Sequence, residues 1–76
     1  EPDYTTAYLY RGLARTKMQN RLGAIADYTE VIRLNPEDAI AYFYRGLACI
    51  KIGHRLDAIR DLRQAAELFS LQGDQA

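Results

Sequence analysis

The chain carries nearly the same octapeptide twice, and this internal repeat restricts the fold more than any other feature. Residues 7–14 read AYLYRGLA and residues 41–48 read AYFYRGLA, so the two segments differ at one position and lie 34 residues apart. Further identities share this offset: Pro2 and Pro36, Lys17 and Lys51, Arg21 and Arg55, Leu22 and Leu56, Ala24 and Ala58, Ile25 and Ile59, Asp27 and Asp61, and Leu34 and Leu68. Self-similarity at a fixed period is typical of a repeat architecture. We therefore treat the chain as one unit used twice.

Apolar residues within each unit recur at the three- and four-residue spacing of an amphipathic helix. The pattern predicts helices at about residues 5–18, 22–34, 39–52 and 56–72. Pro36 ends the second helix, because the residue before a proline is pushed out of helical geometry. Asp38 can cap the third helix, Gly53 can stop it, and Asn20, which tolerates left-handed backbone, suits the first turn. The sequence has no strand signal, so we expect an all-α fold.

The repeat also divides the chain. We expect residues 1–4 to be the tail of a preceding repeat, residues 5–38 to be repeat 1, residues 39–72 to be repeat 2, and residues 73–76 to be a frayed C-terminus. The reason for the first division is that Pro2 aligns with Pro36, which closes repeat 1. We therefore expect the segment to belong to a longer array.

Composition excludes several classes of function. Ten basic and ten acidic side chains give a net charge of zero, which argues against a general nucleic-acid binder. Arg55, Arg60 and Arg63 alternate with acidic residues, so a solvated mixed face is favoured over an RNA-binding surface. No apolar run approaches the roughly 18 residues of a membrane span, so we expect no membrane partner. Cys49, the single cysteine, cannot form an internal disulfide and suits a reducing compartment, so we expect an intracellular, cytoplasmic location.

The sequence offers little for catalysis. Cys49 and His54 are the only residues of their kinds, and no third group supports them as nucleophile and base. There is no second ligand pair for zinc and no glycine-rich phosphate loop. We therefore predict a non-catalytic protein with no cofactor and no metal.

The residues that recur between the units resemble one family. They are an aromatic residue at Tyr8 and Tyr42, glycine at Gly12 and Gly46, alanine at Ala24 and Ala58, a large residue at Tyr28 and Leu62, a small one at Val31 and Ala65, and a proline at Pro36. With the 34-residue period, this pattern resembles the tetratricopeptide repeat over residues 5–72. The resemblance implies two tandem antiparallel helical hairpins, stacked as a right-handed α-solenoid. Glycine costs about 1 kcal/mol in a helix, so its use at one register predicts close packing there.

The chain departs from the family pattern at several positions. They are Arg11 and Arg45, where the family usually has leucine, Arg15 and Cys49, where it often has an aromatic residue, and Ser70, where the closing proline is missing. An arginine on a packed helix face needs a partner. Because Asp27 and Asp61 recur on the partner helix of each hairpin, we predict the ion pairs Arg11–Asp27 and Arg45–Asp61. The alternative for these arginines is ligand binding.

In the family, the first helix of each hairpin lines a concave groove. By this resemblance, the groove positions are Thr6, Leu9, Tyr10, Leu13, Thr16 and Lys17 in repeat 1, and Ile40, Phe43, Tyr44, Leu47, Ile50 and Lys51 in repeat 2. Exposed apolar and aromatic patches usually mark interaction sites. We therefore expect a protein-interaction module that binds a peptide or a partner helix. The alternative is a structural segment of a longer scaffold, in which this row packs only against neighbouring repeats.

Two further expectations concern partners. One family subtype grips acidic C-terminal tails with a lysine and asparagine clamp, but the matching positions here hold Leu9, Leu13 and Tyr44, so we do not predict such binding. Repeat arrays normally need about three units and polar caps. This chain has two units, and we expect Leu68, Phe69 and Leu71 near its end to lack cover. We therefore expect self-association through the open ends.

Overall fold

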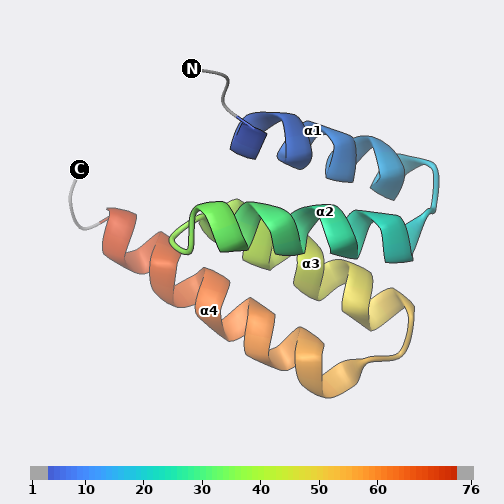
Figure 1. Ribbon diagram of the computed structural model, residues 1–76. Helices are drawn as coiled ribbons and strands as arrows, with labels where there is room; N and C mark the ends of the chain where they lie inside the picture. The colour runs from blue at the N-terminus through green and yellow to red at the C-terminus, as the bar shows by residue number, and fades with distance from the viewer. Residues whose placement is uncertain (1–3, 74–76) are drawn as a thin grey trace.

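The computed structural model describes residues 4–73, which form four α-helices joined by short turns (Figure 1). The helices are α1 (Tyr4–Lys17), α2 (Arg21–Leu34), α3 (Ala39–Lys51) and α4 (Arg55–Gly73). No strand occurs within this range, so the all-α fold class is confirmed. Each helix begins and ends within about two residues of its predicted bounds. The expectations for residues 1–3 and 74–76 lie outside the described residues, whereas Tyr4 begins α1 and Gly73 ends α4.

The turns within the two hairpins adopt the same motif, although their residues differ. In the first, the N–H groups of Gln19 and Asn20 donate to the carbonyls of Thr16 and Arg15 at 3.0 and 2.8 Å. In the second, Gly53 and His54 donate to Ile50 and Cys49 at 3.1 and 2.8 Å. This pair of bonds defines a Schellman motif, in which the residue after the C-cap has positive φ. That residue is Gln19 (φ 62°) in one turn and Gly53 (φ 85°) in the other.

The prediction that Asn20 would take up left-handed backbone was therefore wrong. Asn20 has a φ of −85° and caps α2 instead, with its side-chain oxygen accepting a hydrogen bond from the Gly23 N–H at 3.1 Å. An asparagine side chain can satisfy an otherwise unpaired N–H at a helix start, and the positive φ falls on the preceding residue. Asp38 caps α3 in the same way, accepting from the Ala41 N–H at 3.1 Å.

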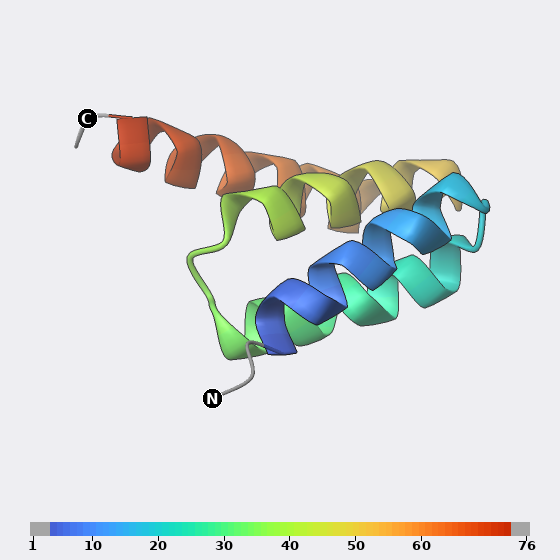
Figure 2. The ribbon, with the colours of Figure 1, turned by 90° about the horizontal axis from the view of Figure 1, so that it is seen from above.

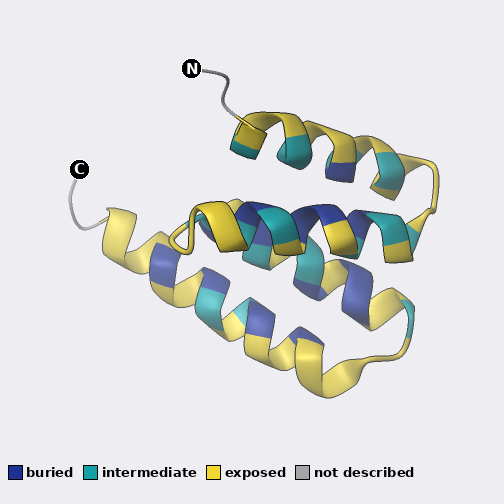
Figure 3. Cartoon of the chain, in the orientation of Figure 1, coloured by how far each residue is buried: buried dark blue, intermediate teal, exposed yellow. Residues whose placement is uncertain are grey.

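The four helices form two antiparallel hairpins, and α2 of the first packs against α3 of the second (Figures 1 and 2). Buried side chains lie on the facing sides of the helices, whereas the outer sides of α1 and α4 are largely exposed (Figure 3). The buried apolar residues are Ala24, Tyr28 and Val31 on α2, Ala39, Ala41, Ala48 and Cys49 on α3, and Ala58, Ala65 and Leu68 on α4. The core is thus centred on the two inner helices. The expectation that Leu68 lacks cover was wrong, because Leu68 is buried, whereas Phe69 and Leu71 are 45% and 53% exposed.

A glycine of each hairpin packs against a large side chain of the partner helix. A Cβ added at Gly12 would lie 2.6 Å from Cε1 of Tyr28, and one added at Gly46 would lie 2.9 Å from Cγ of Leu62. Both distances are too short for a side chain, so the missing Cβ is what lets the large residue of the partner helix pack directly on the backbone. The close packing predicted at these two glycines is therefore present in both hairpins. No helix within residues 4–73 has the length and apolar character that crossing a membrane requires.

Candidate functional site

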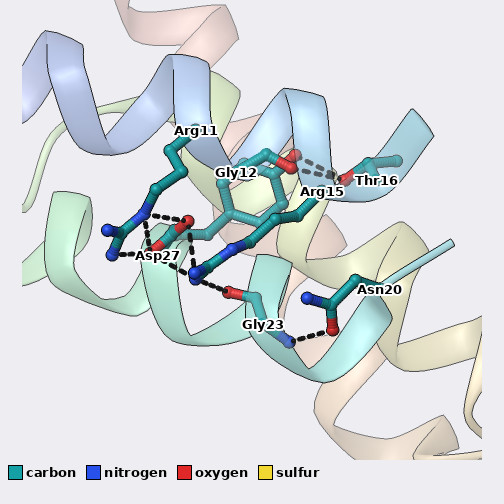
Figure 4. A network of polar contacts seen from close by, with 8 residues as sticks. Arg11, Gly12, Arg15, Thr16, Asn20, Gly23 and Asp27 are labelled. Atoms are coloured by element: carbon teal, nitrogen blue, oxygen red, sulfur yellow. Dashed lines mark hydrogen bonds and ion pairs between the residues drawn. The ribbon is translucent and has the colours of Figure 1, made fainter. Parts of the chain in front are cut away.

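Both predicted ion pairs, Arg11–Asp27 and Arg45–Asp61, are present in the structure. In the first hairpin, Arg11 donates from Nε to Oδ2 of Asp27 at 3.0 Å and from Nη2 to Oδ1 at 2.8 Å (Figure 4). In the second, Arg45 donates from Nε and Nη2 to the two oxygens of Asp61 at 2.8 and 2.7 Å. The side chains of Asp27 and Asp61 are 2% and 6% exposed. Each buried carboxylate is therefore held by a two-pronged arginine, a charge-assisted arrangement that fixes geometry.

The sequence did not predict that a second arginine would join the first pair. Nη1 of Arg15 lies 3.2 Å from both oxygens of Asp27 and 3.5 Å from the carbonyl of Gly23 (Figure 4). Arg15 follows Arg11 by four residues and therefore lies on the same helix face. This spacing could have predicted that both arginines reach Asp27. At the same register the second hairpin has Cys49, so Asp27 meets two guanidinium groups and Asp61 meets one.

The two paired arginines also differ in their surroundings. Nη1 of Arg45 donates to Oγ1 of Thr29 on α2 at 3.2 Å, so this arginine links the hairpins and its side chain is 21% exposed. Arg11 has no helix on its outer side within the described residues, and its side chain is 55% exposed. Each guanidinium also lies over a tyrosine ring, Arg11 over Tyr8 at 5.4 Å and Arg45 over Tyr42 at 5.6 Å. These contacts favour a structural role over ligand binding.

The predicted groove positions remain accessible to solvent. Tyr10 is 66% exposed, and Ile40, Phe43 and Leu47 are each more than a third exposed. Thr6, Lys17 and Lys51 are exposed, whereas Leu9, Leu13 and Tyr44 are half-buried. The exposed apolar groove positions are therefore concentrated on α3, with Tyr10 on α1.

Four of the predicted groove positions gather in one small hollow with two other residues. The hollow has a volume of about 180 Å³ and is lined by Thr16 of α1, Arg21 of α2, and Tyr44, Leu47, Ala48 and Lys51 of α3. Its lining contains two cations and no acidic side chain. Arg21 and Ala48 were not predicted, because only the packing of α2 against α3 brings them beside the groove row. The hollow can receive an apolar group and place an anion beside it.

Tyr44 forms a wall of this hollow and also joins the hairpins. Its ring stacks on that of Tyr28 with the centroids 6.0 Å apart and the planes inclined at 26°. Phe43 meets Tyr44 edge to face at 5.4 Å, a favourable arrangement for aromatic rings. Part of the row expected to bind a partner is therefore used for packing inside the molecule.

A larger hollow of about 320 Å³ lies between α2 and the second hairpin. It is bordered by Ile25, Thr29, Arg45, Cys49 and Asp61 among others, so its inner charges already pair with each other. Burial raises the pKa of the Cys49 thiol, which disfavours the reactive thiolate. Within residues 4–73 no cluster of three or more histidine, cysteine or acidic residues could hold a metal ion. This hollow therefore offers less for recognition than the smaller one.

Comparison with family models, with curated proteins and with solved structures found no match for the chain.

Proposed function

We propose that the chain is a non-catalytic protein-interaction module of the tetratricopeptide type, with its two hairpins stacked as part of a right-handed α-solenoid. The 34-residue repeat, the glycine–large-residue contacts in both hairpins and the antiparallel helices support this proposal. The module holds a peptide or partner helix along α1 and α3. The free, buried Cys49 suits a reducing compartment, so we place the module in the cytoplasm.

The observation that carries the proposal is the hollow beside Leu47. An apolar cavity of about 150 Å³ can hold benzene, so a hollow of about 180 Å³ suits one aromatic or leucine side chain of a partner. Phe43 and Ile40 extend an apolar surface along the same helix. Arg21 and Lys51 line the hollow and favour a carboxylate next to the inserted side chain. The expected ligand is therefore a segment with one bulky apolar anchor flanked by an acidic residue.

A peptide-display selection tests this recognition directly. Random peptides are selected on the chain, and enriched sequences are synthesised and titrated by calorimetry. We expect enriched peptides to pair a bulky apolar residue with a neighbouring Asp or Glu. Leu47→Arg, which fills the hollow with a charged side chain, should weaken their binding by tenfold or more, because a buried apolar anchor is worth about 1.5–3 kcal/mol. Lys51→Ala should weaken binding less and reduce its dependence on salt.

The matched control is Leu56→Arg, which makes the same change at a leucine that is 77% exposed on α4 and does not line the hollow. This variant should bind the selected peptides as the unchanged chain does. Equal binding to Leu47→Arg and Leu56→Arg would place recognition elsewhere and overturn the proposed site.

The stacking of Tyr44 on Tyr28 favours one alternative, a structural segment of a longer scaffold without a ligand of its own. In that case the exposed row serves contact between repeats. A selection that enriches no peptide dependent on Leu47 would support this alternative.

A further inference from the structure

The outer side of α1 repeats a helix face that is covered elsewhere in the molecule. On α3 Tyr44 stacks on Tyr28 of α2, Ala41 and Ala48 share its helix face, and Ile52 follows directly after the helix. The residues at the same register of the first hairpin are Ala7, Tyr10, Ala14 and, directly after α1, Met18, which we call the α1 row. Ala41 and Ala48 are 0% and 6% exposed. In the α1 row both alanines are exposed, and Tyr10 and Met18 are 66% and 75% exposed.

The outer side of α4 supplies the other half of the same interface. On α2 Tyr28 and Thr29 contact α3, and Ile25 and Ile32 share their side of the helix. On α4 the residues at the same register are Ile59, Leu62, Arg63 and Ala66, which we call the α4 face. Tyr28 and Thr29 contact Tyr44 and Arg45 of α3. Ile59 is 46% exposed, and Arg63 and Ala66 are also exposed.

We propose that the α4 face of one copy docks on the α1 row of the next copy, so that the α2–α3 interface continues between molecules. The partner is a second copy because this chain carries both surfaces. The α1 row corresponds in register to the side of α3 that contacts α2, and the α4 face corresponds to the side of α2 that contacts α3. The contact is head to tail: it joins different surfaces of the two copies and leaves one of each free for a further copy. This proposal does not depend on peptide binding in the groove.

The charges at this contact weaken it. Inside the molecule Arg45 donates to the hydroxyl of Thr29, but between copies Arg11 would meet Arg63 at the equivalent position. Arg15 adds a second guanidinium beside Arg11, and the two share one carboxylate. Like charges in contact repel, and salt screens exposed charges. Association should therefore be weak, with a dissociation constant near millimolar, and should strengthen as salt is raised.

Two blocking variants test the head-to-tail geometry. Ala14→Arg blocks the α1 row, Ile59→Arg blocks the α4 face, and both positions are exposed enough to keep the fold, which circular dichroism verifies. In sedimentation equilibrium up to about millimolar concentration, the unchanged chain should form dimers and higher species. Each variant alone should be monomeric, whereas an equimolar mixture should form a one-to-one dimer through the two unblocked surfaces. A mixture that stays monomeric while the unchanged chain associates would overturn the geometry.

A gain-of-association variant separates this contact from any other. Arg63→Thr restores the residue found at Thr29 and removes the like charge, so it should tighten association by about threefold and abolish its increase with salt. Ala26→Arg is the control. Ala26 is exposed on α2 and corresponds in register to Arg60 of α4, so an arginine is already tolerated at this register. This variant should leave association unchanged. A monomeric chain at every salt concentration, or Arg63→Thr without effect, would overturn the proposal.

Discussion

Arg11 and Arg45 occupy the same register, yet their carboxylates depend on them to different degrees. Asp27 accepts from Arg11 and Arg15, whereas Arg45 is the side chain that bonds Asp61 within residues 4–73. Removing one partner of a buried pair is costly because the other charge remains desolvated, although an intact pair adds little net stability. The second hairpin should therefore be the more sensitive of the two.

Replacement of each arginine by methionine tests this difference while keeping a long helix-forming side chain. Arg45→Met should lower the free energy of unfolding by about 2–4 kcal/mol, because it strands Asp61, which is 5% exposed. Arg11→Met should cost about 1 kcal/mol or less, because Arg15 still holds Asp27. Urea unfolding followed by circular dichroism measures both.

The double variant Arg11→Met with Arg15→Met is the control for this prediction. It strips Asp27 of both arginines and should cost about as much as Arg45→Met alone. Equal losses for Arg11→Met and Arg45→Met would show that Arg15 does not support Asp27.

At the scale of the helices, the two hairpin turns have the same hydrogen-bond geometry, but the residue with positive φ is strained to a different degree in each. Gln19 at φ 62° stands where the second hairpin has Gly53 at φ 85°. A side chain in left-handed backbone costs roughly 1 kcal/mol, which glycine avoids. Glycine also increases the entropy of the unfolded chain, which offsets part of that advantage.

Exchanging the two residues should therefore shift stability in opposite directions. Gln19→Gly should raise the free energy of unfolding by about 0.5 kcal/mol, and Gly53→Gln should lower it by about 1 kcal/mol. Thermal unfolding followed by circular dichroism measures each change. Gly73→Ala provides a comparison at a helix end where an added Cβ meets no atom within 4 Å. If both turn variants shift the melting temperature in the same direction, the shared motif does not govern the stability of these turns.

The helices could be predicted closely because their signals are local. Spacing of apolar residues, Pro36 after α2 and the Asp38 cap are all read within a few positions of the helix ends. The hydrogen bond of 2.8 Å between the hydroxyls of Thr16 and Tyr28 could not be predicted in this way, because it joins separate helices. At the same register the second hairpin has Ile50 and Leu62 in place of Thr16 and Tyr28. Because both hydroxyl groups are absent there, neither is left buried without a hydrogen-bond partner.

At the scale of the whole molecule, identical residues acquire different roles through their neighbours. Tyr10 and Tyr44 stand in nearly identical octapeptides, so the sequence predicted one role for both. The Tyr44 ring stacks on Tyr28 of α2, whereas Tyr10 is 66% exposed. The hollow beside Leu47 was missed for the same reason, since α1, α2 and α3 each contribute to it.

The stability of a repeat protein is approximately a sum of contributions from its units and from the interfaces between them. Because Tyr44 of the second hairpin stacks on Tyr28 of the first, it should couple the stabilities of the two hairpins. Amide hydrogen exchange measured by NMR at dilute, monomeric concentration should show the strongest protection in α2 and α3, where the core lies. Tyr44→Ala should lower protection in both hairpins by about 1–3 kcal/mol, since it removes an aromatic contact between them. Tyr10→Ala makes the same chemical change at the same register without an opposing helix and should shift protection by less than about 0.5 kcal/mol. Equal effects of the two variants, or protection concentrated in α1, would mean that the α2–α3 contact does not hold the hairpins together.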